Sequence, residues 1–389
     1  MLATLVIFAI AGTVLLHPAF HADLARFVRR NRLRDVDERQ IRAFVSQISV
    51  IIPARNEETT LPALLDTLEA QSHSPREIIV VDDQSDDGTA CVAARPSTRV
   101  LQVGERPDGW LGKPWALHNG AEVATGEFLL FLDADVRLKP HALETLARAM
   151  MGRTSDGPRV NTVLTVQPFH RTVRYRERMA LLFNILVFVG AARRKRGLRF
   201  TMEGSCCFGP CILCGRSAYR AVGGYSAVRR SILDDMDIGR RFVESGAGVR
   251  SFSGRGVIEF RMYPGGVRDL LNGFAKNVLL GARRSVGWFR VLSVLWITGL
   301  LAAPLYVAML AAEAMIPELV VAIVFYTFFV IQVAAAGNRL GSFGALPAIF
   351  FPVHLATFLF VLLRASVLAV MGRNVVWKGR RLHAETGLE

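Results

Sequence analysis

Long hydrophobic runs lie at both ends of the chain. Residues 2–16 carry no charged side chain, and Phe20 extends this run towards the roughly 20 residues that a helix needs to cross a bilayer. Three further hydrophobic runs near that length are 291–315, 319–336 and 346–371. The pattern therefore predicts a transmembrane anchor over residues 1–22 and a transmembrane region over residues 288–372.

The middle of the chain alternates short hydrophobic runs with amphipathic segments. The runs that we expect to be buried strands are 48–52, 78–81, 100–103, 128–132 and 160–166. The segments that we expect to be helices are 61–70, 115–124 and 140–151. Strands and helices that alternate at this spacing predict an α/β domain with a mostly parallel sheet over residues 48–287. Because ligands of such sheets bind beyond the carboxyl ends of the strands, the polar residues that close each strand are the candidate site.

Arginines directly follow the first hydrophobic run, at positions 26, 29, 30, 32 and 34. A cleaved signal peptide carries its positive charges before its apolar run, so this order favours an uncleaved anchor. The arginines then keep residues 23–47, a basic linker, in the cytoplasm, and the α/β domain follows on that side. This predicts a multi-pass protein of the cell (inner) membrane with a cytoplasmic domain.

The number of C-terminal spans stays open. Glu313 and Glu318 flank the turn between the first two late runs, which fits the outer side, and the basic tail over 373–389 fits the inner side. One early span and three late spans would place that tail outside. Proline can break a helix at Pro304, Pro347 and Pro352, so one late run can be re-entrant or interfacial.

A further hydrophobic segment, 179–192, is too short to cross a bilayer. It is followed by a basic cluster at positions 193, 194, 195, 196 and 199. An apolar helix with a basic end predicts an interfacial helix on an anionic leaflet. The alternative is a buried core helix followed by a solvated basic loop.

The overall charge supports a membrane protein. The 389 residues include 47 Lys and Arg against 33 Asp and Glu, a net charge of +14, and 51% of them are hydrophobic. Such an apolar chain is not disordered, and five cysteines are too few for a disulfide scaffold. A nucleic-acid partner is disfavoured, because no base-stacking aromatic residues are interleaved with the arginines.

Acidic side chains close two of the predicted strands. Asp82 and Asp83 follow the second strand, and Asp133 and Asp135 follow the fourth. Two carboxylates one residue apart can hold Mg²⁺ or Mn²⁺, which completes its shell with substrate phosphates. The alternative is a pair of capping acids before the helix at 140. No G-x-G-x-x-G motif follows the first strand, and Pro114 stands where a P-loop needs Ser or Thr, so dinucleotide and P-loop sites are poorly supported.

Four cysteines lie close together in the segment 206–214. Structural zinc sites usually join two separated pairs of ligands, and no histidine lies nearby. We therefore expect these cysteines to be small buried residues that line a loop, rather than metal or redox ligands.

Taken together, the motifs resemble family-2 glycosyltransferases of the GT-A fold. Residues 49–58 are similar to the first strand of that family, 77–89 to its second strand, and Asp133-Ala134-Asp135 to its metal motif. Residues 215–225 and 233–239 are similar to its acceptor half. The resemblance divides the domain into a donor half, 48–152, and an acceptor half, 153–287, which contains the helix near 179–192.

The resemblance also implies roles for particular residues. It places the nucleotide base and ribose beside Pro53, Arg55, Glu57, Asp82 and Asp83. It makes Asp133 and Asp135 ligands of Mg²⁺ or Mn²⁺ at the diphosphate, with Lys113 beside the donor. Asp235 matches the family's catalytic base. Asp234, Lys276 and Arg261 are further candidates for contact with the acceptor or diphosphate, although Lys276 can equally face lipid phosphate.

Within the family, the segments 110–117, 261–264 and 273–277 look most like the carotenoid-acid (diaponeurosporenoate) glucosyltransferases and their hopanoid-associated relatives. We therefore expect an inverting enzyme that moves one sugar from a UDP- or GDP-sugar to a membrane lipid, an isoprenoid or carotenoid hydroxyl or carboxylate. The alternatives are transfer to a polyprenyl phosphate or polysaccharide synthesis. The chain lacks the Q-x-x-R-W motif of the processive synthases, which argues against polymer synthesis.

Overall fold

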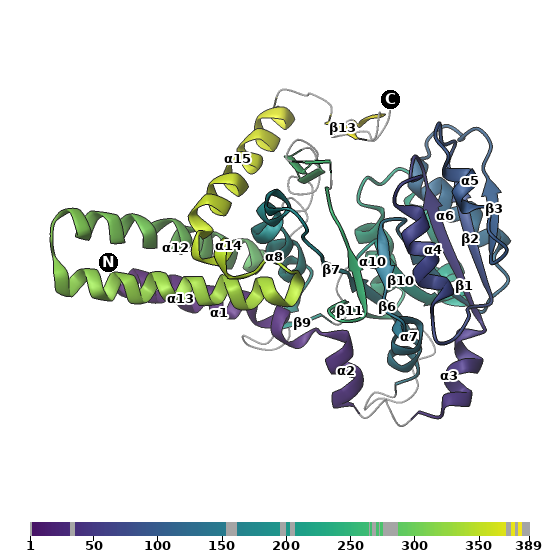
Figure 1. Ribbon diagram of the computed structural model, residues 1–389, viewed down its shortest axis with the longest axis horizontal. Coiled ribbons are helices and arrows are strands. Elements are labelled where there is room, and N and C mark those ends of the chain that lie inside the picture. Colours follow the sequence, from purple (N-terminus) through teal and green to yellow (C-terminus); the bar gives the residue numbers. More distant parts are fainter. Residues whose placement is uncertain are drawn as a thin grey trace. The chain divides into compact units, whose positions relative to one another are not determined.

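The computed structural model describes residues 2–31, 36–152, 162–194, 200–202, 207–263, 265–266, 270–271, 273–274, 287–370, 375–377 and 380–382. The chain forms two compact units (Figure 1). The sheet unit comprises Ala22–Phe169 and Thr201–Arg261. The helical unit comprises Met1–His21, His170–Phe200 and Met262–Ala384.

A seven-stranded sheet forms the centre of the sheet unit, with the strand order β11-β6-β10-β4-β1-β2-β3. The strands are β1 (Ile48–Ala54), β2 (Glu77–Asp82), β3 (Thr98–Gln102), β4 (Phe128–Leu132), β6 (Thr162–Gln167), β10 (Cys211–Gly215) and β11 (Gly248–Ser253). Only β10 runs antiparallel to its neighbours, β4 and β6. The predicted α/β fold with a mostly parallel sheet is confirmed, and five of these strands overlap the predicted runs.

Helices follow most of the parallel strands. The helices of this unit are α2 (Leu24–Arg30), α3 (Glu38–Val45), α4 (Leu61–Glu69), α5 (Thr89–Ala93), α6 (Gly112–Val123), α7 (Ala142–Met151), α9 (Arg216–Ala221) and α10 (Asp234–Glu244), with the 3₁₀ turn η3 (Gly224–Val228). Helix α6 lies so close to β1 that a Cβ atom at Gly120 would come within 2.5 Å of the Ile51 side chain. Glycine at this position therefore sets the distance between helix and sheet.

Short strands complete the description. They are β5 (Val136–Leu138), β7 (Phe169–His170), β8 (Arg193–Arg194), β9 (Phe200–Thr201), β12 (Ile258–Phe260), β13 (Val375–Trp377) and β14 (Arg380–Leu382). Strands β5 and β12 pair antiparallel, and so do β13 and β14.

The segment 23–47, predicted as a linker, is part of the sheet unit. Asp23 caps α2 by accepting a hydrogen bond of 2.7 Å from the backbone amide of Arg26. Ile41 and Val45 of α3 are buried. Helices α2 and α3 both pack against α7. A linker was expected from the arginines, but charged residues can occupy the solvent face of a helix whose other face is apolar.

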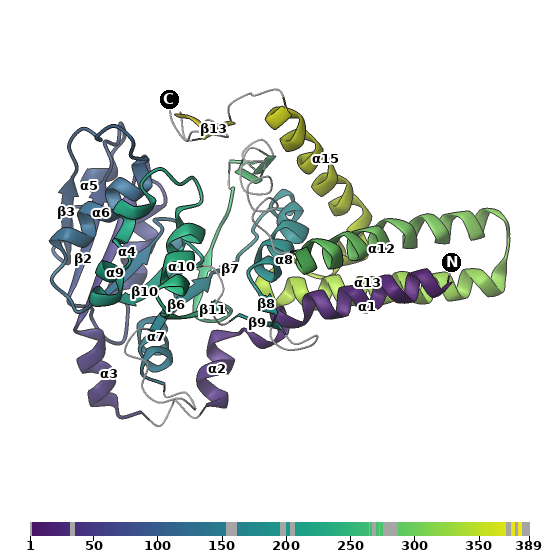
Figure 2. The ribbon, with the colours of Figure 1, turned by 180° about the vertical axis from the view of Figure 1, so that it is seen from behind.

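Within the described part of the helical unit, three helices are long and apolar enough to cross a membrane, by length and composition: α1 (Leu2–His21), α12 (Gly287–Ala312) and α13 (Ile316–Leu340). They pack against one another, and Figure 2 shows α1 running beside α13. This confirms the prediction of apolar helices at both ends of the chain. The last predicted run is divided into α14 (Ala345–Ile349) and α15 (Phe351–Val370), at a point flanked by Pro347 and Pro352.

Polar side chains join these three helices. The indole Nε1 of Trp296 in α12 donates a hydrogen bond to Oε1 of Gln332 in α13 over 3.0 Å. Nε2 of Gln332 donates to the carbonyl of Ala9 and to the hydroxyl of Thr13 in α1, over 2.9 and 3.0 Å. Burial of the Gln332 amide is acceptable in an apolar bundle because both of its ends have partners.

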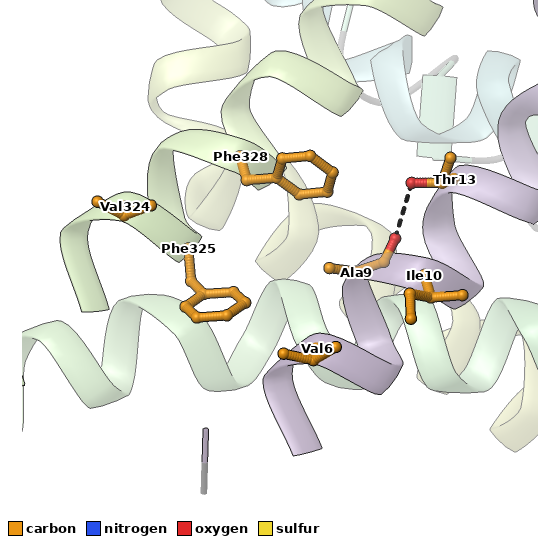
Figure 3. Close-up of a pocket in the computed structure, with 7 residues that line it drawn as sticks. All are labelled: Val6, Ala9, Ile10, Thr13, Val324, Phe325 and Phe328. Carbon is orange, nitrogen blue, oxygen red and sulfur yellow. Dashed lines mark hydrogen bonds between the residues drawn. The ribbon is translucent and has the colours of Figure 1, made fainter. Parts of the chain in front are cut away.

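A cavity of about 210 Å³ lies between α1 and α13 and is lined by Val6, Ala9, Ile10, Thr13, Val324, Phe325 and Phe328 (Figure 3). The Thr13 hydroxyl is the polar side-chain group among these lining residues, and it donates back to the carbonyl of Ala9 over 3.0 Å. The lining is therefore apolar.

The segment predicted as an interfacial helix belongs to the helical unit. It consists of the 3₁₀ turn η2 (Tyr175–Ala180) and α8 (Leu181–Gly190). Seven of the ten residues of α8 are buried, because the helix is apolar on nearly every side and has no polar face to expose. The structure thus favours the alternative of a buried core helix. It also places this segment outside the sheet unit, whereas the sequence assigned it to the acceptor half. Residues 195–199 of the basic cluster lie outside the described residues.

Candidate active site

Lys113 and Asp133 form an ion pair beyond the carboxyl end of β4. Asp133 is the first residue after β4, and Lys113 is the second residue of α6. The Lys113 Nζ atom lies 2.5 Å from Asp133 Oδ1, and the two side chains are 36% and 27% exposed. The pair is therefore accessible from solvent.

The turn before β10 connects this pair to Asp235. The backbone amide of Asp133 donates a hydrogen bond of 3.2 Å to the carbonyl of Pro210. One residue earlier, the backbone amide of Gly209 donates to Asp235 Oδ2 over 2.9 Å. The hydroxyl of Thr165, in β6, accepts from the amide of Phe208 over 2.7 Å and so fixes the turn. Residues predicted from two separate motifs, Asp133 and Asp235, are thus brought to one turn.

Asp235 lies in the first turn of α10, next to the buried Asp234. Its second oxygen, Oδ1, accepts a hydrogen bond of 2.9 Å from the backbone amide of Met236. An ideal Cβ atom at Gly209 would lie 3.1 Å from Asp235 Oδ2 and 3.3 Å from Lys113 Nζ. The predicted base and the predicted donor lysine therefore face the same small volume.

The acids around Lys113 control its charge. Partial burial alone would lower the pKa of Lys113, but the carboxylates of Asp133, Asp234 and Asp235 outweigh that effect and raise the pKa above its ordinary value. Lys113 is therefore a permanent cation beside the acids. A fixed positive charge of this kind can stabilise a departing diphosphate.

The ends of β1 and β2 bring together a second group of predicted residues. Nη1 of Arg55 donates to the backbone carbonyl of Asp83 over 3.0 Å, and the amide of Asp83 donates to the carbonyl of Ala54 over 2.9 Å. Asp82 and Asp83 are buried. The side chain of Asp82 accepts hydrogen bonds from the amide and hydroxyl of Ser85 and so shapes the following turn.

The remaining predicted residues are less completely placed. Pro53 and Glu57 are half-buried beside Arg55, and the amide of Glu57 donates to the hydroxyl of Thr89 over 2.8 Å. Arg261 is half-buried one residue after β12, and Lys276 lies outside the described residues. The roles proposed for Arg261 and Lys276 stay predictions.

The carboxylates suit a divalent cation of the kind expected. Asp133 and Asp135 are both half-buried in the turn between β4 and β5. In the part of the chain that the structure describes, no group of three or more His, Cys, Asp or Glu side chains is arranged to hold a metal ion. Two carboxylates fit Mg²⁺ or Mn²⁺, because such ions commonly take their other ligands from water and substrate phosphates.

Sequence reasoning missed Gly209 and Thr165. Gly209 contacts Asp235 through its backbone amide, which every residue except proline carries, so the dipeptide Gly209-Pro210 was the only local signal of a turn. Sequence reasoning also did not foresee that Trp110, Trp115 and His118 would cluster, with the Trp110 ring 5.0 Å from each of the other two.

The cysteines near this turn are buried. Cys207, Cys211 and Cys214 lie in the core and form no disulfide bond with one another, and Cys206 lies outside the described residues. Burial raises the pKa of Cys214 to about 12, and burial together with the nearby Asp133 raises that of Cys211 further. Thiols of such high pKa are protonated and unreactive at neutral pH, as expected for buried structural cysteines.

Comparison with known proteins gives consistent matches. The family described as Glycosyl transferase family 2 matches residues 49–235. A 4,4'-diaponeurosporenoate glycosyltransferase of Staphylococcus haemolyticus is 32% identical over 273 residues, which cover 69% of this chain and 71% of that protein. The protein of the same name from Staphylococcus aureus strain USA300 is 30% identical over 341 residues, which cover 86% and 88%.

Solved structures were matched as well. A mannosyltransferase from Pyrobaculum calidifontis in complex with GDP-mannose and Mn²⁺ has a TM-score of 0.48 and 18% identity, covering 93% of this chain and 99% of that one. Glucosyl-3-phosphoglycerate synthase from Mycobacterium tuberculosis, with Mn²⁺ and UDP, has a TM-score of 0.39 and 20% identity, covering 62% and 81%.

Proposed function

This chain belongs to glycosyl transferase family 2, and from that premise we propose that it moves one sugar from a nucleotide-diphosphate sugar to a membrane lipid. The relatives named for transfer to diaponeurosporenoate support a carotenoid or other isoprenoid acceptor that ends in a carboxylate or hydroxyl. The observation that carries the proposal is the meeting of Lys113, Asp133 and Asp235 around the Gly209 turn.

The donor is held at the ends of three parallel strands. Arg55, Asp82 and Asp83 bind the base and ribose, beyond β1 and β2. Asp133 and Asp135 hold Mg²⁺ or Mn²⁺, which when bound neutralises charge on the diphosphate. The Lys113 ammonium, which lies beside these carboxylates, donates hydrogen bonds to the departing phosphate oxygens.

The acceptor reacts beside Asp235. We propose an inverting displacement, in which the acceptor oxygen attacks the sugar from the face opposite the diphosphate. If the acceptor is a hydroxyl, Asp235 accepts its proton as general base. If it is a carboxylate, which has an ordinary pKa of about 4, it is already ionised and needs no base, so Asp235 removes no proton from it.

The charges of the helical unit support the proposed orientation in the membrane. Arg290 lies near the start of α12 and Arg339 near the end of α13, where its guanidinium lies 5.9 Å from the Phe20 ring at the end of α1. Glu313 and Glu318 lie at the opposite ends of α12 and α13. The arginine end is therefore cytoplasmic by the positive-inside rule. The sheet unit follows α1 at Ala22 and is on that side, and with three spans the basic tail is too.

Purified full-length protein in lipid nanodiscs tests the function directly. It is incubated with a panel of UDP- and GDP-sugars, and with a carotenoid carboxylic acid or the corresponding alcohol. Mass spectrometry should find one sugar on one acceptor, with Asp135→Asn as the inactive control. A sugar found only on polyprenyl phosphate, or a long polymer, would contradict the proposal.

A further inference from the structure

Lys113 forms an ion pair with a carboxylate oxygen that we propose as a ligand of the metal ion. Its Nζ lies 2.5 Å from Asp133 Oδ1, and the pair is half-exposed. Asp133 is also the first carboxylate of the Asp133-Ala134-Asp135 motif, so the same side chain contacts the Lys113 ammonium and is a proposed ligand of the divalent cation. This inference rests on the function proposed above.

The ammonium and the metal ion oppose each other at this carboxylate. Mg²⁺ binds carboxylate oxygens at about 2.0–2.1 Å, so an ion on either oxygen of Asp133 would lie within a few ångströms of Nζ in its present position. Two positive charges at such a distance repel each other, and Lys113 already neutralises part of the carboxylate charge that attracts the ion. Metal binding therefore requires Lys113 to move away from Asp133 or costs affinity.

A diphosphate removes this conflict. It brings negative charge for both cations, and a flexible lysine can exchange the Asp133 oxygen for a phosphate oxygen without leaving the site. The Gly209 turn leaves room beside the lysine for this movement, because Gly209 has no side chain. A Cβ atom at this position would lie 3.3 Å from Nζ and would crowd it.

We propose that Lys113 is an internal counter-ion which keeps the affinity for the bare metal ion low and makes metal and nucleotide bind together. Neutralising Lys113 has opposite effects on the two ligands. The metal ion alone binds more tightly, because the Lys113 ammonium no longer competes with it for Asp133. The nucleoside diphosphate binds more weakly, because its phosphate oxygens lose the hydrogen bonds from Lys113. A lysine with a purely structural role would not produce opposite signs.

Binding of Mn²⁺, followed by the electron paramagnetic resonance signal of the free ion, tests the proposal on full-length protein in nanodiscs. Lys113→Met and Lys113→Gln should bind Mn²⁺ alone about tenfold or more tightly than the wild type. With Mn²⁺ saturating, both should bind UDP or GDP, whichever the wild type prefers, about tenfold more weakly, since a charge-assisted hydrogen bond is lost.

Two further variants control for charge and for general disruption. Lys113→Arg keeps the positive charge and should retain the weak binding of Mn²⁺ alone. Lys139→Met removes a lysine from another ion pair of the sheet unit, with Glu259 at 2.8 Å, and should leave both binding curves unchanged. The proposal is overturned if neither neutral variant binds Mn²⁺ alone more tightly than the wild type. The proposed function fails on a different result, the absence of sugar transfer by the wild type.

Discussion

The backbone amide of Gly209 donates a hydrogen bond of 2.9 Å to Oδ2 of Asp235. The amide of Met236 holds the other oxygen, Oδ1, over the same distance. Both oxygens of the proposed base are therefore oriented by main-chain groups, one from its own helix and one from the turn that also holds Asp133. The position of Asp235 depends on a turn 26 residues earlier in the chain.

Gly209→Ala should lower kcat about tenfold with little loss of stability. The added methyl group would lie 3.1 Å from Asp235 Oδ2 and 3.3 Å from Lys113 Nζ, so at least one of these groups must shift, and small displacements at a reacting centre are costly. Gly215→Ala is the matched control at the other end of β10, where the nearest atom is 3.8 Å away. Steady-state kinetics and thermal unfolding compare the two. Equal activity in both variants would contradict a positioning role for the turn.

The strands and their acidic ends could be predicted because their signal is local. The run of β4 is hydrophobic throughout and that of β1 is interrupted by Ser49 alone before Pro53, as expected for strands buried on both faces. The residue after such a run lies at the ligand edge of a parallel sheet, so Asp82, Asp83 and Asp133 could be assigned without coordinates.

The turn at Gly209 could not be predicted in the same way. Strand β10 enters the sheet antiparallel between β4 and β6, and only this topology places Pro210 against Asp133. The nearby run of cysteines suggested a loop, whereas Cys211 and Cys214 are the first and fourth residues of the strand. The turn at Gly209 depends on the pairing of strands that are distant in the sequence, and hydrophobic periodicity does not predict which strands pair.

Asp135→Asn should remove most transfer activity and weaken the binding of Mn²⁺ and of the nucleotide together. An amide replaces one of two anionic ligands, and hard cations bind neutral oxygen less strongly. Asp66→Asn is a suitable control, because Asp66 pairs with Arg95 on the surface of the same unit and such pairs contribute little. Titration with Mn²⁺ in the presence of nucleotide measures the effect. Full activity of the intact wild type in EDTA would refute a metal-dependent mechanism.

The helical unit should lose stability as the pH falls from 6.5 towards 4. His170 is fully buried, with its Nδ1 accepting a hydrogen bond of 3.1 Å from Asn184. Burial lowers its pKa to about 4, against a smaller opposing effect of Glu177. The unfolded chain, with an ordinary pKa near 6.5, binds the proton first, so stability is complete above pH 6.5 and decreases below it by up to about 3 kcal/mol.

Thermal unfolding at several pH values tests this on His170→Gln. The variant should be less stable than the wild type at neutral pH but should show a weaker dependence on pH between 6.5 and 4. His141→Gln is the control, because that imidazole is 72% exposed. If the wild type and His170→Gln lose stability equally over this range, another group is responsible.

The sheet unit should be cytoplasmic. A protease-cleavage site inserted near Glu105, in the exposed loop that follows β3 of the sheet unit, should be protected in intact cells and cleaved after lysis. In the proposed orientation the arginine end of the helical unit, where α1 ends and the sheet unit begins, is cytoplasmic. A second site at Ala314, in the turn between α12 and α13, should be cleaved in intact cells. The reverse pattern would invert the proposed orientation.

The role of Asp235 reports the chemical type of the acceptor. With a hydroxyl acceptor, Asp235→Asn should lower the rate roughly 10²- to 10⁴-fold, the usual contribution of a general base. With a carboxylate acceptor the loss should be much smaller, because no proton has to be removed and an amide oxygen can still accept from the Gly209 amide.

Glu244→Gln, at the exposed end of the same helix, controls for changes in α10. Rates for the carotenoid acid and the matching alcohol, measured on the same variant, separate the two cases. A large and equal loss of rate with both acceptors would show that Asp235 acts on the donor instead. A general base matters only for the alcohol, because the alcohol must lose a proton and the carboxylic acid is already ionised.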